Sequence, residues 1–525
     1  MTSTLATLSS NPQFVALASL LTKVLTRSNI SKAFGVYLLY IILRYRNSIY
    51  GLPTRTDIPG PRGLPLIGNF ILVAGMRRDR LLQRQVENHR KYGKIYTMTI
   101  PGVGRIVNIS DPEMIDHVLR INFWAYEKGE YLRKGLAPLV GGGIFAADGE
   151  HWKWQRKLAS HIFNVKAFRT YTSSVFVEEA KLVIEYLSTK AGSGEVVDLQ
   201  ELFYKFTLDS FGEIAFGQSF GCLNKPAEAV PFAVAFDRLN AALSERLFVP
   251  TAVLKEWWDG TYGQVEKDTQ TVNEFAYRVI RERRENAHKN SDRKDLMQLF
   301  MDTQDDKGNP LSDEMLKDTL NNFVLAGRDT TAQALSWTFY LMHREQAADR
   351  RIVKELVDET DRLLQGGYPT YESTKEQKYA EACFHETLRL YPSVPKNVKT
   401  CVEDDVLPGG YKIYKNEKIG WSPWAMGRDT SLWGLDAEVY KPERWLSGEK
   451  PPQAKFVAFH VGPRTCLGQQ FATIEAITIM SMLMQKFTFE LVEPKLEPAY
   501  LPALTLPMAH GLPVRVKHRN LTQSI

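Results

Sequence analysis

The chain has 525 residues, of which 44% are hydrophobic, 24% charged and 11% aromatic. This composition is typical of a globular protein with a large apolar interior and excludes a disordered or fibrous one. The formal charge of +6 comes from basic residues spread along the sequence without long lysine or arginine runs, so no nucleic acid partner is expected. Length alone leaves the number of domains open.

The cysteines form none of the paired spacings of a disulfide framework, a structural zinc site or a c-type haem. All four lie far apart in the sequence: Cys222, Cys383, Cys401 and Cys466. Free thiols in so long a chain suit a reducing compartment, so we expect most of the protein to face the cytosol.

The N-terminal region carries two apolar stretches, residues 14–25 and 33–43, which Arg27 and Lys32 separate. Neither stretch has the roughly 20 apolar residues that an upright membrane span needs. A single tilted span, a hairpin and an interfacial helix therefore all stay open. We predict a membrane anchor over residues 1–46.

Clustered prolines follow in the segment 58–65, where they fix the backbone and forbid a helix. We interpret residues 47–69 as a stiff connector; an ordinary proline-rich loop is the alternative. From residue 70 onward the sequence has no internal repeat, low-complexity tract or second linker, so residues 70–525 are predicted to form one large catalytic domain.

Apolar spacing predicts the elements of this domain. Alternation favours strands at residues 95–100 and 106–109, whereas helical periodicity is clear at 175–187, 318–342, 351–364, 377–390 and 470–484. The predicted fold class is mainly α with small β sheets.

Trp152 and Arg156 stand one helical turn apart, so an indole N–H and a guanidinium can point the same way. Such donors suit a paired carboxylate ligand. A plain tryptophan-rich amphipathic helix is the alternative.

Residues 326–331 interrupt a long apolar helix with a glycine, an acid and two threonines. The Thr330 hydroxyl can bond back to a carbonyl one turn earlier and open a local bulge beside a ligand. A helix that merely has a polar face would show the same pattern.

Glu386 and Arg389 lie at i and i+3 on one predicted helix face, within side-chain reach. A solvated helix salt bridge is the weak alternative. His385 and Glu386 start a zinc HExxH pattern, but Arg389 stands where the second histidine would be, so that metal site is rejected.

The strongest local pattern is the run 459–468, which leads directly into a predicted helix. Glycines on both sides of Cys466 let the backbone approach a flat ligand and point amide N–H groups at the sulfur. These donors and the following helix N-terminus keep a thiolate anionic. Read alone, a cysteine is more often a small core residue.

The run resembles the haem-binding signature of the cytochrome P450 family, FxxGxRxCxG. It matches at Phe459, Gly462, Arg464, Cys466 and Gly468. Other family motifs follow the expected order, and the resemblance covers the chain from the proline segment to about Val514. It implies the cytochrome P450 fold and haem b, with Cys466 as the axial thiolate ligand of the iron.

The resemblance also implies roles for the other motifs. Asp329 and Thr330 would relay protons during dioxygen activation. The haem propionates would be bound by Trp152, Arg156 and Arg464, with Lys399 as a further candidate. Glu386 and Arg389 would join Arg444 in a buried ion network near the proximal side of the haem.

A member of this family would hydroxylate a lipophilic substrate with dioxygen and two electrons. The chain has no GxGxxG, so the electrons would come from an NADPH-dependent cytochrome P450 reductase on the same membrane, the endoplasmic reticulum. Lys153 and Lys157 are candidate docking residues. The alternatives are a haem-thiolate isomerase or dehydratase and a non-catalytic haem sensor.

Parts of the sequence point to a kind of substrate. Residues 326–331, 394–397 and 462–472 resemble fungal enzymes that hydroxylate fatty acids and alkanes, whereas residues 424–428 depart from them. Aromatic and aliphatic residues at Phe123, Trp124 and 232–248 are expected to line an apolar pocket, which would equally admit a terpenoid or polyketide secondary metabolite.

Overall fold

The computed structural model describes residues 27–164, 166–225, 230–248, 252–285, 295–305, 308–344, 351–501 and 503–519. Its contacts divide the chain into two units. The first takes in the described residues up to Gly75 together with Thr97–Ile106, and the second takes in Met76–Tyr96 and the described residues from Val107 onward.

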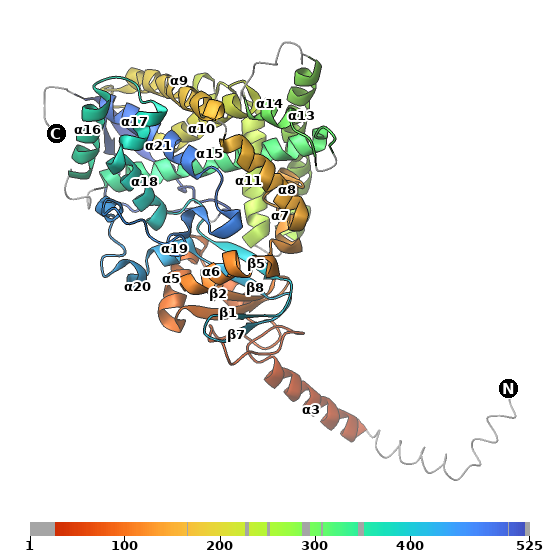
Figure 1. The fold of residues 1–525 in the computed structure, drawn as a ribbon. Coiled ribbons are helices and arrows are strands. Elements are labelled where there is room, and N and C mark those ends of the chain that lie inside the picture. Colours follow the sequence, from red (N-terminus) through yellow and green to blue (C-terminus); the bar gives the residue numbers. More distant parts are fainter. Residues whose placement is uncertain are drawn as a thin grey trace, which may run out of the picture. The chain divides into compact units, whose positions relative to one another are not determined.

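Helices make up most of the described chain (Figure 1). In chain order they are α3 (Arg27–Arg44), α4 (Phe70–Ala74), α5 (Leu81–Tyr92), α6 (Pro112–Asp116), α7 (Gly129–Val140), α8 (Gly149–Asn164), α9 (Lys166–Lys190), α10 (Leu199–Phe216), α11 (Pro231–Phe248), α12 (Ala252–Asp259), α13 (Tyr262–Glu285), α14 (Leu296–Met301), α15 (Asp313–His343), α16 (Arg351–Leu364), α17 (Tyr371–Glu376), α18 (Lys378–Leu390), α19 (Pro423–Gly427), α20 (Thr430–Trp433) and α21 (Gln469–Lys486).

The strands are short and form small sheets. They are β1 (Ile95–Ile100), β2 (Gly104–Ile109), β3 (Tyr126–Glu127), β4 (Val196–Asp198), β5 (Asn397–Cys401), β6 (Asp405–Leu407), β7 (Tyr411–Ile413), β8 (Lys418–Trp421), β9 (Phe487–Leu491) and β10 (Pro513–His518). A five-stranded sheet has the order β1-β2-β8-β5-β3, and a three-stranded sheet has the order β4-β10-β9, while β6 pairs with β7. The antiparallel register of β5 and β8 sets Lys399 opposite Ile419.

The first unit begins with α3, which carries a run of exposed apolar side chains: Phe34, Val36, Tyr37, Leu38, Leu39, Tyr40, Ile42 and Leu43. Among the described residues, no helix combines the length and apolar content needed to cross a bilayer. The other apolar stretch on which the anchor prediction rests, residues 14–25, lies outside the described residues. The membrane anchor therefore stays a prediction.

The proline segment has no helix, as the sequence predicts, and it packs against the part of β1 that belongs to the first unit. Thr97 donates its amide hydrogen to the Pro59 carbonyl at 2.8 Å. Asn69 accepts the Thr99 amide hydrogen at 2.9 Å and donates its own side-chain amide to the Pro61 carbonyl at 3.0 Å. This segment is thus fixed by specific hydrogen bonds.

The second unit is organised around α15, a 31-residue helix that packs along α10 and also contacts α13, α18 and α21 (Figure 1). Gly327 allows the close approach of α15 and α10, because a β-carbon at this position would collide with the Phe211 ring. Trp337, in the same helix, donates its indole N–H to the Leu506 carbonyl at 2.8 Å. A helix buried on so many sides provides a rigid base for side chains.

Every helix and strand predicted from periodicity is confirmed. The predicted strands correspond to β1 and β2, and the predicted helices correspond to α9, α15, α16, α18 and α21. These elements contain many buried residues, although α15, α21 and the two strands are buried on more than one face.

Candidate active site

The loop before α21 holds Cys466 by backbone contacts. The Cys466 amide donates to the Phe459 carbonyl at 2.8 Å, and the Thr465 hydroxyl donates to the Gly462 carbonyl at 2.7 Å. The loop is therefore closed on itself at two points. Cys466 lies three residues before the first residue of α21. At this end of the helix, the helix dipole favours negative charge.

Gly462 is required by this geometry. Its φ of +69° lies in the left-handed region, and a β-carbon there would collide with the Leu119 carbonyl oxygen. The motif glycine is thus the point where the loop presses against the helical turn that contains Leu119.

Opposing effects act on the pKa of the Cys466 thiol. Although its side chain retains solvent-accessible surface, surrounding protein raises the pKa of its thiol through desolvation. The Gly468 N–H and the positive charge of Arg156 act in the opposite direction and favour the thiolate. A cation and an N–H donor aimed at the sulfur are what an anionic ligand atom requires.

Arg464 projects from the same loop toward the start of α8. Its guanidinium donates to Asp148 at 2.9 Å and to the Ala147 carbonyl at 2.8 Å, and it lies over the Trp152 ring at 4.4 Å from the ring centroid. The buried Arg464 Nε has no hydrogen-bond partner. Burial lowers the pKa of Arg464 to about 10.

Asp148 joins several parts of the site through one carboxylate. It accepts the backbone N–H groups of Lys128 and Gly129 at 2.9 and 3.2 Å, and it pairs with Arg133 at 2.9 Å as well as with Arg464. Sequence reasoning missed Asp148. The available signal was its position just ahead of the helix that carries Trp152.

The α8 residues lie as their spacing predicts. Trp152 is buried against the Phe123 ring, with centroids 5.2 Å apart, and Arg156 follows one turn later. Among the described residues, Arg156 makes no ion pair with a carboxylate, and burial lowers the pKa of its guanidinium while Cys466 raises it. The helix thus brings an indole and a guanidinium to the Cys466 side of the molecule.

Two lysines add to the positive charge, of which Lys399 is buried and Lys128 is half-buried. Lys399 donates to the Tyr126 carbonyl at 2.8 Å and lies over the Phe123 ring, so its ammonium has a protein partner. Burial, together with Arg464 and Lys128, lowers the pKa of Lys399 well below its ordinary value. Burial and Arg464 lower the pKa of Lys128 to about 8. Sequence reasoning missed Lys128, for which no motif gave a signal.

These residues fit a haem. Its iron would take the Cys466 sulfur, and its two carboxylates would suit a group of cations that otherwise repel one another. The orphaned Nε of Arg464 is a donor ready for such an anion. Arg464 comes from the cysteine loop and Trp152 and Arg156 come from α8, and the three side chains interact with one another through the Arg464 guanidinium.

Asp329 lies on α15 with almost no exposed surface. The Asn240 side-chain amide donates to one carboxylate oxygen, and Arg328 lies 3.1 Å from the other. Burial raises the pKa of Asp329 to about 6, Arg328 opposes the shift, and Asp237 adds to it. The carboxyl group can therefore hold or release a proton near neutral pH.

A pocket of about 440 Å³ opens at Asp329 between α10, α11, α15 and the segment 501–511. Its lining is partly apolar, including Leu208, Val234 and Leu501, and partly polar. On the polar side of the pocket, Arg328 links two carboxylates, because it pairs with Asp237 at 2.5 Å as well as with Asp329. This combination of an apolar wall and a few fixed polar groups is typical of a small-molecule site.

The Thr330 hydroxyl bonds back to the Ala326 carbonyl at 2.6 Å, and the Thr330 carbonyl accepts the Ser393 hydroxyl at 2.8 Å. The back-bond is as the sequence suggests. However, α15 remains α-helical throughout Asp313–His343, so the expected local bulge was wrong. The hydroxyl shares the carbonyl oxygen without displacing the helix hydrogen bond.

Glu386, Arg389 and Arg444 meet as the motif implies. Arg389 donates to both Glu386 oxygens at 2.7 and 2.8 Å, and Arg444 Nε reaches the carboxylate at 3.3 Å. The Trp445 indole and the Lys441 amide complete its shell. Because Glu386 and Arg389 have no exposed side-chain surface, the solvated salt bridge is excluded.

The aromatic residues expected to line an apolar pocket behave differently from one another. Phe232 and Phe236 pack in a core cluster with Phe220 and Phe275, Phe123 packs on Trp152, and 56% of Trp124 is exposed. The lining of the pocket at Asp329 instead uses smaller residues of α11. Large rings of this helix contribute more by filling the core than by facing a ligand.

Comparison with known proteins gives a consistent result. The cytochrome P450 family model matches residues 58–509. Cytochrome P450 monooxygenase cyp1 of Mycosarcoma maydis is 38% identical over 512 residues, which cover 92% of this chain and 79% of that protein. Cytochrome P450 86B1 of Arabidopsis thaliana is 36% identical, covering 79% and 77% of the two chains. Cytochrome P450 704C1 of Pinus taeda is 34% identical, covering 87% and 92%.

A fold built on one long buried helix, with a cysteine loop backed by cations, defines a haem-thiolate oxidoreductase. The chain belongs to the cytochrome P450 family. Its cofactor is haem with an axial cysteine thiolate, and its enzyme class is that of the P450 monooxygenases.

Proposed function

We propose that this protein hydroxylates a lipophilic substrate with dioxygen and two electrons from an NADPH-dependent cytochrome P450 reductase. The observation that carries the proposal is the Cys466 loop, in which a thiol faces an N–H donor and the Arg156 cation. Haem, when bound, supplies the iron at which dioxygen is activated. The residues of the protein bind the haem and determine the charge around it.

Cys466 is the proposed ligand, and its thiolate is favoured by Gly468 and Arg156. Arg464, Trp152 and Arg156 are proposed to bind the propionates, because an indole and two guanidiniums match carboxylate oxygens. Lys399 already donates to a backbone carbonyl, so its proposed contribution is positive charge. Phe459 and Gly462 hold the shape of the loop through the contacts described above.

Asp329 is the proposed proton carrier. Its carboxyl group has a pKa of about 6, which suits reversible protonation in the cytosol. Thr330 is proposed to receive that proton with its hydroxyl, which stands one residue away on the same buried helix. Such a pair argues for the monooxygenase over an isomerase, a dehydratase or a haem sensor, none of which needs protons delivered for dioxygen activation.

The proposed substrate class is lipophilic, such as a fatty acid, alkane or terpenoid. The pocket at Asp329, with a volume of about 440 Å³ and aliphatic residues in its lining, supports this class. Lys153 and Lys157 are exposed on α8 and are proposed to contact the reductase.

Attachment to the endoplasmic reticulum membrane, with the catalytic unit on the cytosolic side, is part of the proposal. The exposed apolar surface of α3 supports membrane contact in any of the three geometries. Four cysteines without a disulfide support a reducing compartment.

The test is a reconstitution of the holoenzyme with reductase, NADPH and a panel of fatty acids, alkanes and terpenoids under ¹⁸O₂. One labelled oxygen in the product, formed only with NADPH and reductase, is expected. Product without electrons would indicate an isomerase or dehydratase, and binding without product for every compound would favour a sensor. Cys466→Ala should lose the thiolate-type spectrum of the reduced, CO-bound haem, whereas the matched Cys222→Ala should keep it.

A further inference from the structure

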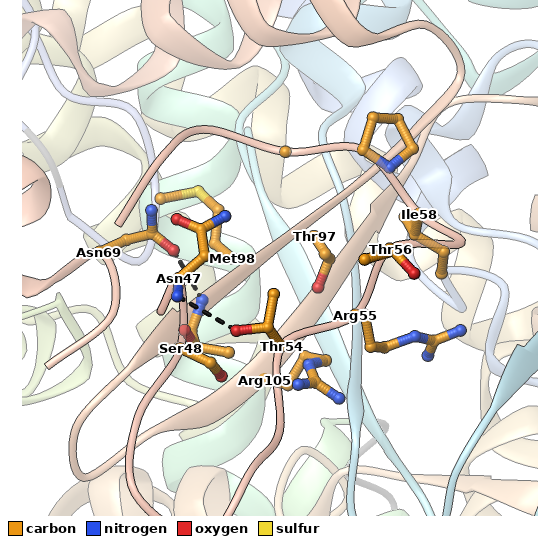
Figure 2. Close-up of a pocket in the computed structure, with 13 residues that line it drawn as sticks. Asn47, Ser48, Thr54, Arg55, Thr56, Ile58, Asn69, Thr97, Met98 and Arg105 are labelled. Atoms are coloured by element: carbon orange, nitrogen blue, oxygen red, sulfur yellow. Dashed lines mark hydrogen bonds between the residues drawn. The ribbon is translucent and has the colours of Figure 1, made fainter. Parts of the chain in front are cut away.

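A second pocket lies entirely within the first unit, and none of the residues assigned above belongs to its lining. It has a volume of about 210 Å³ and is lined by residues of the segment after α3 and of the strand region 97–105 (Figure 2). Its 13 lining residues include two arginines, Arg55 and Arg105, and no acidic residue. A small pocket with this charge points to an anion.

The pocket contains hydroxyl groups that lack partners. Ser48 and Thr99 are 1% and 3% exposed, and neither of their hydroxyl oxygens has a hydrogen-bond partner. Thr54, which is also part of the lining, accepts the Asn47 amide hydrogen at 3.1 Å (Figure 2). Because buried hydroxyls are costly without partners, these two indicate a polar occupant.

The arginines are fixed by the protein. Arg105 is 5% exposed and donates to the Pro53 carbonyl. Arg55 pairs with Asp57 through its Nε at 2.9 Å, and that aspartate lies outside the lining, with about half of its side chain exposed. These contacts hold the two guanidiniums in place, which pre-organises them for oxyanion recognition.

The size of the pocket limits the occupant. Drug-sized ligands occupy pockets of roughly 300–1,000 Å³, whereas about 30 Å³ is the share of one liquid water molecule. A pocket of about 210 Å³ therefore suits a compact polar group. A phosphate group has only acceptor oxygens and negative charge, which matches guanidinium and hydroxyl donors.

We propose that the pocket formed by Arg55, Arg105, Ser48 and Thr99 binds a phosphate group, and that in the cell this group is the headgroup of an anionic phospholipid. The lipid source rests on the proposed membrane attachment of α3. That helix ends at Arg44, three residues before the first pocket residue, Asn47, so lipid contact along α3 brings headgroups to the pocket entrance.

The test uses the full-length holoenzyme and two kinds of phosphate. In one arm, inorganic phosphate is titrated and followed by ³¹P line broadening. In the other arm, co-sedimentation compares vesicles of phosphatidylcholine alone with vesicles that contain phosphatidic acid. Arg55→Gln removes one guanidinium, and Ser48→Ala with Thr99→Val removes the two hydroxyls.

Arg62→Gln is the matched control, because Arg62 is exposed in the same segment and lies outside the pocket lining. Arg55→Gln is expected to weaken both kinds of binding by about tenfold or more, since a hydrogen bond to a charged group is lost. The hydroxyl variant is expected to weaken them severalfold, and Arg62→Gln by less than twofold. Thermal melting of each variant, followed by circular dichroism, identifies loss of fold.

Equal binding by wild type, Arg55→Gln and the hydroxyl variant would overturn the site. Binding of inorganic phosphate that is lost in both variants, without preference for phosphatidic acid vesicles, would keep the phosphate site and overturn the lipid source. Neither result depends on monooxygenase turnover, so failure of the proposed reaction leaves this inference intact.

Discussion

The guanidinium of Arg464 and the carboxylate of Asp148 lie 2.9 Å apart, and both side chains are nearly buried. This ion pair ties the loop that carries Cys466 to the start of α8. Because Asp148 also accepts two backbone N–H groups from Lys128 and Gly129, one carboxylate fixes the relative positions of three chain segments.

Asp148→Asn should therefore loosen the cysteine loop. Removing one partner of a buried charge pair costs about 3–5 kcal/mol when the other charge is left buried. The small exposed fraction of these side chains lets solvent reduce this cost. We expect lower haem content per protein and a lower melting temperature. Absorbance ratios of the purified protein and calorimetry measure both.

The control for this change is Glu130→Gln, which removes a carboxylate from an exposed pair with Lys134 on α7. That variant should retain wild-type haem content. If Asp148→Asn also kept full haem content and stability, the role of Asp148 in holding the loop would be wrong.

Glu386→Gln tests the buried network against a pair of the same spacing. Glu386 and Arg389 are i,i+3 partners with no exposed side-chain surface, whereas Glu178 and Lys181 are i,i+3 partners of which Glu178 is largely exposed. We expect the first substitution to destabilise the protein by about 3–5 kcal/mol and Glu178→Gln to cost less than about 0.5 kcal/mol. Urea unfolding of both variants measures the difference, and similar midpoints would contradict it.

Gly462→Ala should combine backbone strain with a steric clash against the Leu119 carbonyl. A cost of about 1–3 kcal/mol is expected from the left-handed conformation alone, and the clash adds to it. Gly192→Ala is the matched control, because Gly192 has a φ of +82° and open space around its α-carbon. Equal melting temperatures for the two variants would show that the contact with Leu119 is unimportant.

Coupling of NADPH oxidation to product formation should depend on the protonation of Asp329. Its pKa is raised to about 6, so the protonated fraction falls as pH rises from 5 to 8. We expect the product formed per NADPH to fall over this window in wild type, and Asp329→Asn to have low coupling at every pH. The ratio of product formed to NADPH consumed is measured, because both quantities depend on the reductase rate and that rate therefore cancels.

The titratable and charged groups that face this carboxyl are Arg328, which stays charged across the same window, Asp237, and Tyr204, whose pKa is raised by burial. A matched substitution, Asp237→Asn, should leave a pH dependence with a slightly lower midpoint, because Asp237 raises the pKa of Asp329. A pH profile of Asp329→Asn that matched wild type would rule out Asp329 as the titrating group.

The sequence was sufficient for the elements that bury a periodic apolar face and for motifs whose members lie close in the chain. The spacing of Glu386 and Arg389 on α18 is an example, since helix geometry alone brings the two side chains together. Contacts between distant segments could not be predicted in the same way. Asp148 and Lys128 gained their importance from the position of Arg464, which no local pattern encodes.

At Thr330 the limit of the sequence lies in the backbone and not in contacts between distant segments. The sequence correctly indicated a side-chain bond to the Ala326 carbonyl, but it could not show whether the helix would open. Packing of α15 against α10 and α21 decided that question, because a helix held on several sides has little room to bulge.

The Arg464–Asp148 pair also bears on how the protein is made. These residues are 316 positions apart, so during synthesis the carboxylate leaves the ribosome long before its guanidinium partner. The cysteine loop cannot be fixed until nearly nine-tenths of the chain has been translated, and the cofactor is therefore captured at the very end of production. Truncated or stalled chains should accumulate as empty, protease-sensitive species.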